Sequence, residues 1–219
     1  MASLQQSVRR DQADGLRRLF TAPLPSLCTV LSAGSREGKS ALMQRLVQNM
    51  AQRGRAVLVL EASAAVSADG CCTLSDIVRG APAGTLAKAL HHHVSESSRI
   101  VLGDASDDVL STALREIAAG TFRLLVDADL DASGQLPLSV LSEGELVLQV
   151  DAEPASIREA YEIMRSLKSL SLPGTLSLLV TGASAAHARQ VQANLFQAAS
   201  RYLAMPVRTI VPPAVARHV

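Results

Sequence analysis

Residues 27–54, "LCTVLSAGSREGKSALMQRLVQNMAQRG", form the stretch that decides the fold class. An apolar run of strand length, "LCTVLS", opens the stretch, and a helix-like run, "ALMQRLVQNMAQRG", closes it. The connection between them, "AGSREGKS", consists of small and charged residues, which are typical of a loop. The order strand, loop, helix is the unit from which α/β folds are built.

The rest of the chain repeats this alternation of strand-length apolar runs and longer helical patterns. The expected strands are 27–32, 56–61, 99–103, 122–128, 145–150, 175–181 and 207–211. Helical patterns lie between them at 39–53, 73–79, 84–92, 107–119, 155–170 and 184–203. The strand runs are continuously apolar, which indicates strands that are covered on both faces. The sequence therefore predicts a three-layer, doubly wound α/β domain with a mostly parallel sheet, and ligands at the carboxyl ends of the strands.

Length and composition limit the class of protein further. The chain has 219 residues, 48% of them hydrophobic and 19% charged, with a net charge of +1. This predicts one α/β domain over 27–219, after a flexible segment and proline-containing linker at 1–26. A near-neutral charge without a Lys/Arg stripe argues against direct nucleic-acid binding. The N-terminus is too polar for a signal peptide, and Cys28, Cys71 and Cys72 are interpreted as reduced thiols, so we expect a cytoplasmic protein.

The loop "GSREGKS" has the composition of a phosphate-binding loop at its end but not at its start. In such a loop, backbone N–H groups surround an anion at the N-terminus of a helix. Gly38, Lys39 and Ser40 match the end of the pattern G-x-x-x-x-G-K-[ST], in which the lysine reaches the outer phosphates and the hydroxyl binds Mg²⁺. Ala33 stands where the first glycine belongs, and Gly34 comes one place late. Two interpretations remain open: a loop that still holds a nucleotide, or the remnant of one.

Acidic residues follow two of the expected strands. Asp127 ends the fourth strand, where an aspartate is the usual outer partner of Mg²⁺ beside a phosphate loop, with Asp129 and Asp131 as further candidates. The alternative for this segment is a solvated loop of turn-forming residues. Glu61 ends the second strand, where phosphate-loop ATPases often carry an acidic residue that helps to place the attacking water.

Three stretches resemble a known family. The segment "DQADGLRRLF" (11–20) resembles the N-terminal DQAxxLR motif of the FlhG/FleN group (YlxH, MotR-like), MinD/ParA-like ATPases that regulate flagellar number and placement. The stretch "DAEPASIREAYEIMRSL" (151–167) is similar to this group's segment after the fifth strand, and "GSREGKS" (34–40) aligns with its K-G-G-V-G-K-T loop. The resemblance covers nearly the whole chain and implies a P-loop-NTPase-like core that binds ATP with Mg²⁺. The residues that match the N-terminal motif are Asp11, Gln12, Ala13, Leu16 and Arg17.

The chain departs from this family at the residues that contact the nucleotide. The family's signature lysine falls on Gly34, its two loop glycines on Ser35 and Arg36, and its small hydrophobic residue on Glu37. Its hydrolytic aspartate falls on Ser63, and a serine cannot orient water as a carboxylate does. The carboxylate of Glu37 is expected to repel a phosphate. The neighbouring Arg36 either offsets this repulsion or contacts a phosphate itself. We therefore expect weakened ATP binding and impaired hydrolysis. The tail "VPPAVARHV" contains two prolines and is short, so we do not expect it to form the family's membrane-targeting amphipathic helix.

The N-terminal segment is the part that the resemblance assigns to a partner. Residues 8–20 are short, cationic and weakly amphipathic, so they are expected to order on a partner, the alternative being an exposed disordered tail. The resemblance implies that this segment binds the signal-recognition-type GTPase FlhF and stimulates its GTP hydrolysis. Gln12 and Arg17 are the candidates for the stimulating groups. A flagellar transcription activator or a switch-complex protein is the candidate for a second partner.

The leading interpretation is thus a flagellar regulator with a damaged nucleotide site. One alternative is an active ATPase switch with nucleotide-dependent dimerisation, in which Arg36 replaces the signature lysine and Glu61 the hydrolytic carboxylate. The other is an ATP-dependent small-molecule synthetase of the same superfold. The predicted Mg²⁺ ligands in a nucleotide-bound form are Ser40 and Asp127. The predicted nucleotide-binding residues are Gly34, Arg36, Gly38, Lys39, Ser40 and Asp127.

Overall fold

The described part of the chain is built around one seven-stranded sheet. The computed structural model describes residues 27–62, 73–81, 86, 100–103, 106–118, 123–170 and 175–210. The strands are β1 (Leu27–Ser32), β2 (Val57–Ala62), β3 (Ile100–Val101), β4 (Arg123–Ala128), β5 (Glu145–Asp151), β6 (Leu176–Thr181) and β7 (Val207–Ile210). Their order is β3-β2-β4-β1-β5-β6-β7, and every pair of neighbours is parallel. The predicted doubly wound parallel sheet is confirmed.

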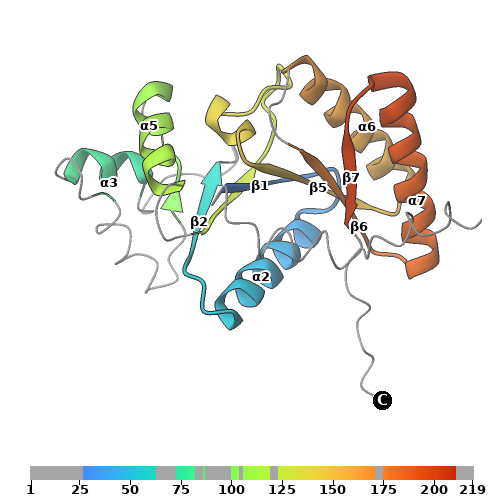
Figure 1. Cartoon of the computed structure of the whole chain (residues 1–219), viewed down its shortest axis with the longest axis horizontal. Helices are drawn as coiled ribbons and strands as arrows, with labels where there is room; N and C mark the ends of the chain where they lie inside the picture. The colour runs from blue at the N-terminus through green and yellow to red at the C-terminus, as the bar shows by residue number, and fades with distance from the viewer. Residues whose placement is uncertain are drawn as a thin grey trace, which may run out of the picture.

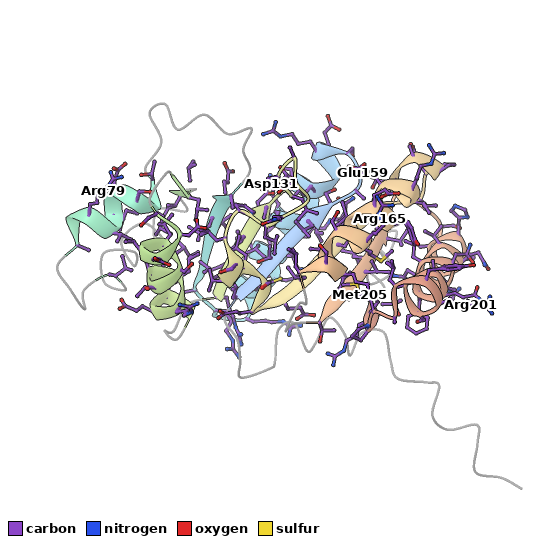
Figure 2. All side chains as sticks on the ribbon, turned by 90° about the horizontal axis from the view of Figure 1, so that it is seen from above. Arg79, Asp131, Glu159, Arg165, Arg201 and Met205 are labelled. Carbon is purple, nitrogen blue, oxygen red and sulfur yellow. The ribbon has the colours of Figure 1, made fainter. Side chains whose placement is uncertain are left out.

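Helices cover both faces of this sheet, which makes three layers. Among the described helices, α2 (Arg36–Gln52) packs on one face, while the others lie on the opposite face (Figure 1). Those on the opposite face are α3 (Leu74–Gly80), α5 (Asp107–Ala118), α6 (Pro154–Ser169) and α7 (Ala185–Ala198). A 3-10 turn, η1 (Ser139–Ser142), precedes β5, and a π-helical turn, η2 (Ala199–Leu203), continues α7. Arg79 on α3 and Arg201 on η2 lie near opposite ends of the molecule (Figure 2).

The core consists of aliphatic side chains on the two sides of the sheet. Under α2, Met43, Leu46 and Met50 pack on strand residues such as Val30 and Leu125. The larger cluster lies on the other side and joins the sheet to α3, α5, α6 and α7. Because both faces of the strands are buried, the strands read as continuous apolar runs in the sequence.

The observed elements agree closely with the expected ones, with two differences. The run at 99–103 is a strand only over Ile100–Val101, because Gly103 turns the chain with a φ of +81°. Helix α2 begins at Arg36 rather than at residue 39. The predicted helix at 84–92 lies almost wholly outside the described residues, as do the N-terminal segment 1–26 and the tail after Ile210.

The thiol of Cys28 is free and buried on β1, and burial raises its pKa strongly. Cys71 and Cys72 lie outside the described residues. Within the described ranges, none of the helices is long and apolar enough to cross a bilayer.

The strand order determines where a site forms. From β1 the sheet extends through β4, β2 and β3 on one side and through β5, β6 and β7 on the other. In such sheets, ligands bind outside the carboxyl ends of the strands where the winding direction reverses. That point is the end of β1, where the loop to α2 begins. The in-register pairs Glu61 with Asp127 and Asp151 with Thr181 bring polar side chains to the same edge.

Candidate functional site

The loop between β1 and α2 is shorter than the sequence predicts. Ser35 is the N-cap of α2, and its side chain accepts a hydrogen bond from the Gly38 amide at 3.1 Å. This cap starts the helix at Arg36, so the prediction that it begins at residue 39 is wrong by three residues. Glu37 therefore lies exposed in the first helical turn, where a negative charge interacts favourably with the helix dipole.

Lys39 is held by the end of β4. Its side chain is only 7% exposed, and its ammonium lies 2.5 Å from Oδ1 of Asp127 and 2.9 Å from Oδ1 of Asp129. It also donates to the carbonyl oxygen of Ala128 at 2.8 Å. An ammonium has three N–H donors, and these three oxygens use all of them. The structure thus brings the predicted site residues Lys39 and Asp127 together as a direct ion pair.

The amides of the loop donate to groups of the chain itself. The Gly34 amide donates to Oγ of Ser32 at 3.0 Å, and the Ser35 amide donates to Oδ2 of Asp151 at 2.8 Å. The Gly38 amide donates to Oγ of Ser35, as described above. In a phosphate-binding loop, such amides point at the bound anion. Here the anion at the loop is the carboxylate of Asp151.

A buried polar network holds that carboxylate in place. Gln149 on β5 is fully buried, and its Nε2 donates to Oδ1 of Asp151 at 2.9 Å and to Oγ1 of Thr181 at 2.8 Å. The Thr181 hydroxyl in turn donates to Oδ1 of Asp151 at 2.8 Å. The Ser32 hydroxyl donates to Oε1 of Gln149 at 2.5 Å, which ties β1 to β5. These bonds use both N–H groups of the Gln149 amide and its oxygen, Oε1. Because the buried amide has all its partners, it stiffens the network.

Both glycines of the loop are explained by this network. A Cβ at Gly34 would lie 2.5 Å from Oδ2 of Asp151, and a Cβ at Gly38 would lie 2.9 Å from Nε2 of Gln149. Neither glycine has positive φ, so close approach and not backbone conformation requires them. Ala33 is not strained either, since among the described non-glycine residues only Ala204 has positive φ.

The segment after β4 combines the two roles that the sequence left open. Asp127 and Asp129 contact Lys39, whereas Asp131 organises its own turn. Oδ1 of Asp131 accepts hydrogen bonds from the amide and hydroxyl of Ser133 and from the amide of Gln135. These bonds, that from the Ser133 hydroxyl above all, lower the pKa of the Asp131 carboxyl below its ordinary value.

The remaining predicted residues lie around the loop or outside the described chain. Arg36 is exposed in the first turn of α2, and Ser40 is half-buried directly after Lys39. Glu61 is buried at the end of β2, in register with Asp127. Ser63 and the five residues of the N-terminal motif fall outside the described residues.

Gln149 and Asp151 were not predicted as parts of the site, whereas the resemblance placed an adenine-contacting asparagine of the family near Thr181 or Gly182. A sequence signal was present: the run 146–150 is apolar except for Gln149, and an aspartate follows it at once. A buried polar side chain needs partners, so such an interruption points to a polar network at the strand end.

The charge of the site disfavours an added anion. Three carboxylates, those of Asp127, Asp129 and Asp151, surround the loop and its lysine, which carries a single positive charge. ATP with Mg²⁺ would use the lysine, the loop amides and the aspartate at the end of β4. In this structure Lys39 is paired with Asp127, and the Ser35 amide donates to Asp151. The residue types therefore suit a nucleotide, and in this arrangement they are paired with groups of the chain itself. In the part of the chain that the structure describes, there is also no group of three or more metal-ligating side chains.

The fold and the position of this loop define the class of protein. A parallel seven-stranded sheet, with a glycine-containing loop from its central strand to a helix bearing lysine and serine, is the architecture of the P-loop-NTPase-like α/β proteins. No protein-family model matches the chain, and no curated protein sequence matches it.

Solved structures show which branch of this class the fold follows. A chain of the MinC:MinD cell division protein complex of Aquifex aeolicus is similar with a TM-score of 0.55 and 15% identity, over 83% of this chain and 79% of that chain. A ParA family ATPase from Chlorobium tepidum TLS is similar with a TM-score of 0.53 and 15% identity, over 85% of this chain and 84% of that one. The fold is therefore that of the MinD/ParA ATPases, as expected.

Proposed function

We propose that this chain is a cytoplasmic flagellar regulator of the MinD/ParA-like type that acts by binding other proteins and has lost most of its ATPase activity. The observation that carries the loss of activity is the closed loop: Lys39 is bonded to Asp127 and Asp129, and the Ser35 amide is bonded to Asp151. The flagellar assignment rests on the resemblance of residues 11–20 to the DQAxxLR motif.

Nucleotide binding is weakened because the loop must first break its own bonds. For Lys39 to reach a phosphate, its buried ammonium must leave Asp127 and Asp129. Separating a buried ion pair costs about 3–5 kcal/mol when no partner replaces the lost one. A bound phosphate offsets part of this cost by pairing with the lysine. Each 1.4 kcal/mol of the cost that is not offset lowers the affinity for the nucleotide about tenfold. Slow or absent turnover follows from the same closed arrangement.

The partner-binding part of the proposal concerns the segment before β1. Its five motif residues are the candidates for contact with an FlhF-type GTPase, and a glutamine or arginine delivered in trans can position or neutralise charge during GTP hydrolysis. Gln12 and Arg17 have this role in the proposal. A flagellar transcription activator or a switch-complex protein is the proposed second partner, bound by the α/β body.

The test is the stimulation of FlhF GTP hydrolysis by the purified full chain. We expect stimulation by the wild type and a loss of about tenfold or more with Gln12→Ala or Arg17→Ala, as for other charge-positioning groups in phosphoryl transfer. Gln6→Ala, which lies in the same segment outside the motif, is the matched control and should stimulate as the wild type does. Equal stimulation by the wild type and Gln12→Ala would contradict the proposal.

An active ATPase switch is the second candidate, and one observation favours it. Glu61 lies at the carboxyl end of β2, in register with Asp127, so a carboxylate is present at this edge of the sheet although Ser63 replaces the hydrolytic aspartate. This candidate predicts ATP turnover that requires Lys39 and Glu61, together with nucleotide-dependent dimerisation. An ATPase assay of the wild type and Glu61→Gln, with sedimentation in ATP and in ADP, distinguishes it from the first proposal.

A further inference from the structure

We propose that the Asp151 carboxylate is an intramolecular ligand of the loop between β1 and α2, and that it competes with a nucleotide's phosphates for the loop amides. This inference deepens the proposed function and rests on it, since it names the residue that closes the loop. Lys39 and its aspartates are expected near any such loop, whereas Asp151 belongs to neither the phosphate-loop pattern nor the acidic strand ends considered from the sequence.

The Asp151 carboxylate contacts the loop directly. Oδ2 of Asp151 accepts the Ser35 amide at 2.8 Å, a charge-assisted bond to the residue that caps α2. The same oxygen lies so close to Gly34 that a Cβ there would be 2.5 Å away. A Cβ at Gly38 would lie 3.5 Å from Oδ1, so the carboxylate reaches both ends of the loop. It therefore stands where a loop-bound anion would stand.

The carboxylate is fixed before any ligand arrives. Gln149 and Thr181 both donate to Oδ1, and the amide of Asp151 donates to Oγ of Ser156 at 2.8 Å at the start of α6. Gln149 is fully buried, so it acts as a positioning residue for the carboxylate. A change of the Asp151 rotamer therefore breaks both bonds to Oδ1 as well as the bond from the Ser35 amide to Oδ2.

The negative charge of Asp151 opposes the binding of a phosphate at the loop. A carboxylate and a phosphate repel each other at the distances of one loop, and an amide that donates to the carboxylate is not available to the phosphate. Asp151→Asn removes the charge and keeps the shape, but its single amide oxygen cannot accept from Ser35 and from Gln149 and Thr181 at once, so the loop amide is held less firmly. This variant therefore opens the loop to phosphate while disturbing the fold least.

The experiment is isothermal titration of the full-length chain with ATP and Mg²⁺. We expect Asp151→Asn to bind ATP at least about tenfold more tightly than the wild type, because one repelling charge leaves the loop. Glu153→Gln, an exposed residue in the same connection, removes the same charge without touching the loop and should bind as the wild type does. The double variant Asp151→Asn with Lys39→Met should lose this increase in ATP affinity. That loss would show that the tighter binding uses the loop and its lysine.

Equal affinity in the wild type and Asp151→Asn overturns the inference, and so does an equal gain in Glu153→Gln. If thermal unfolding shows that Asp151→Asn is not folded, Asp151→Ser replaces it, with the same expectation and the same contradicting result. The proposed function is judged separately by FlhF stimulation with Gln12→Ala. If Asp151→Asn binds ATP more tightly and Gln12→Ala still stimulates FlhF, only the partner assignment is rejected. If Asp151→Asn binds ATP as the wild type does and Gln12→Ala fails to stimulate FlhF, only the role of Asp151 is rejected.

Discussion

The ammonium of Lys39 lies 2.5 Å from Oδ1 of Asp127, so the loop lysine and the aspartate expected to hold a metal ion are bonded directly to each other. The fold creates this contact. Lys39 is in the helix that follows β1, Asp127 ends β4, and β4 is the neighbour of β1 in the sheet. The contact replaces one of the interactions that a nucleotide would make, and it is measurable as a contribution to stability.

Asp127→Asn should lower the free energy of unfolding by about 1–3 kcal/mol. The substitution weakens a hydrogen bond to a buried charged group, which is worth about this much. The measurement is urea unfolding followed by circular dichroism. Glu162→Gln breaks an exposed pair with Arg165 on α6 and should cost less than about 0.5 kcal/mol. Similar effects of the two variants would contradict the buried contact of Lys39.

Gly34→Ala should destabilise the protein by about 1–3 kcal/mol, because its methyl group meets the Asp151 carboxylate at 2.5 Å. The effect should be much smaller when Asp151 is already alanine. A double-mutant cycle in thermal or urea unfolding measures this coupling. Gly80→Ala is the matched control, since a Cβ at Gly80 has no neighbour within 4 Å. Purely additive effects of Gly34→Ala and Asp151→Ala would show that the carboxylate does not lie against the loop.

Ser35→Ala should cost about 1 kcal/mol, the usual effect of removing an N-cap side chain. It should also increase amide hydrogen exchange in the first turn of α2, from Arg36 to Lys39, because the Gly38 amide loses its acceptor. Ser184→Ala, at the N-cap of α7, provides the comparison, with a similar cost and increased exchange confined to α7. Unchanged exchange around Gly38 in the Ser35 variant would mean that α2 does not begin at Arg36.

The stability of the wild type should fall as the pH rises above the ordinary carboxyl range, because of Glu145. Burial raises the pKa of Glu145, and the Ser177 hydroxyl and the charge of Arg208 only partly oppose this. The folded state therefore binds the proton more tightly than the unfolded state. Its contribution is fully present below the unfolded pKa and is lost as the pH rises through the folded pKa.

Glu145→Gln should remove this loss, so the variant should be more stable than the wild type at neutral pH and similar to it in acid. Thermal unfolding over a pH series measures the difference. Glu143→Gln, which replaces an exposed carboxylate paired with Arg115, should leave the pH profile unchanged. An identical pH dependence of the wild type and Glu145→Gln would disprove the raised pKa.

Most of the fold was predictable because the strands are buried on both faces. Their continuous apolar runs, separated by helical patterns, leave little choice but a doubly wound sheet, and the similar solved structures agree. The weakest strand prediction was 99–103, an edge strand with β2 as its partner in the described sheet, where Gly103 ends the pairing early.

The site was predictable only in part, since a sequence shows residue types but not which partners they choose. The proximity of Lys39 and Asp127 follows from the fold, because Lys39 is in the first turn after β1 and Asp127 is near the end of the neighbouring strand β4. The role of Asp151 depends on the register of β5 against β6, which brings Asp151 beside Thr181. It also depends on the start of α2 at the N-cap Ser35, whose amide donates to the Asp151 carboxylate. Neither appears in the spacing of the sequence, because both are contacts between separate elements.

The central claim is that the chain's own carboxylates occupy the contacts of a bound nucleotide. Isothermal titration of the wild type with ATP and with ADP, each with and without Mg²⁺, tests it most directly. We expect no binding of micromolar strength under any of these conditions. Micromolar affinity for either nucleotide, lost in Lys39→Met, would contradict it.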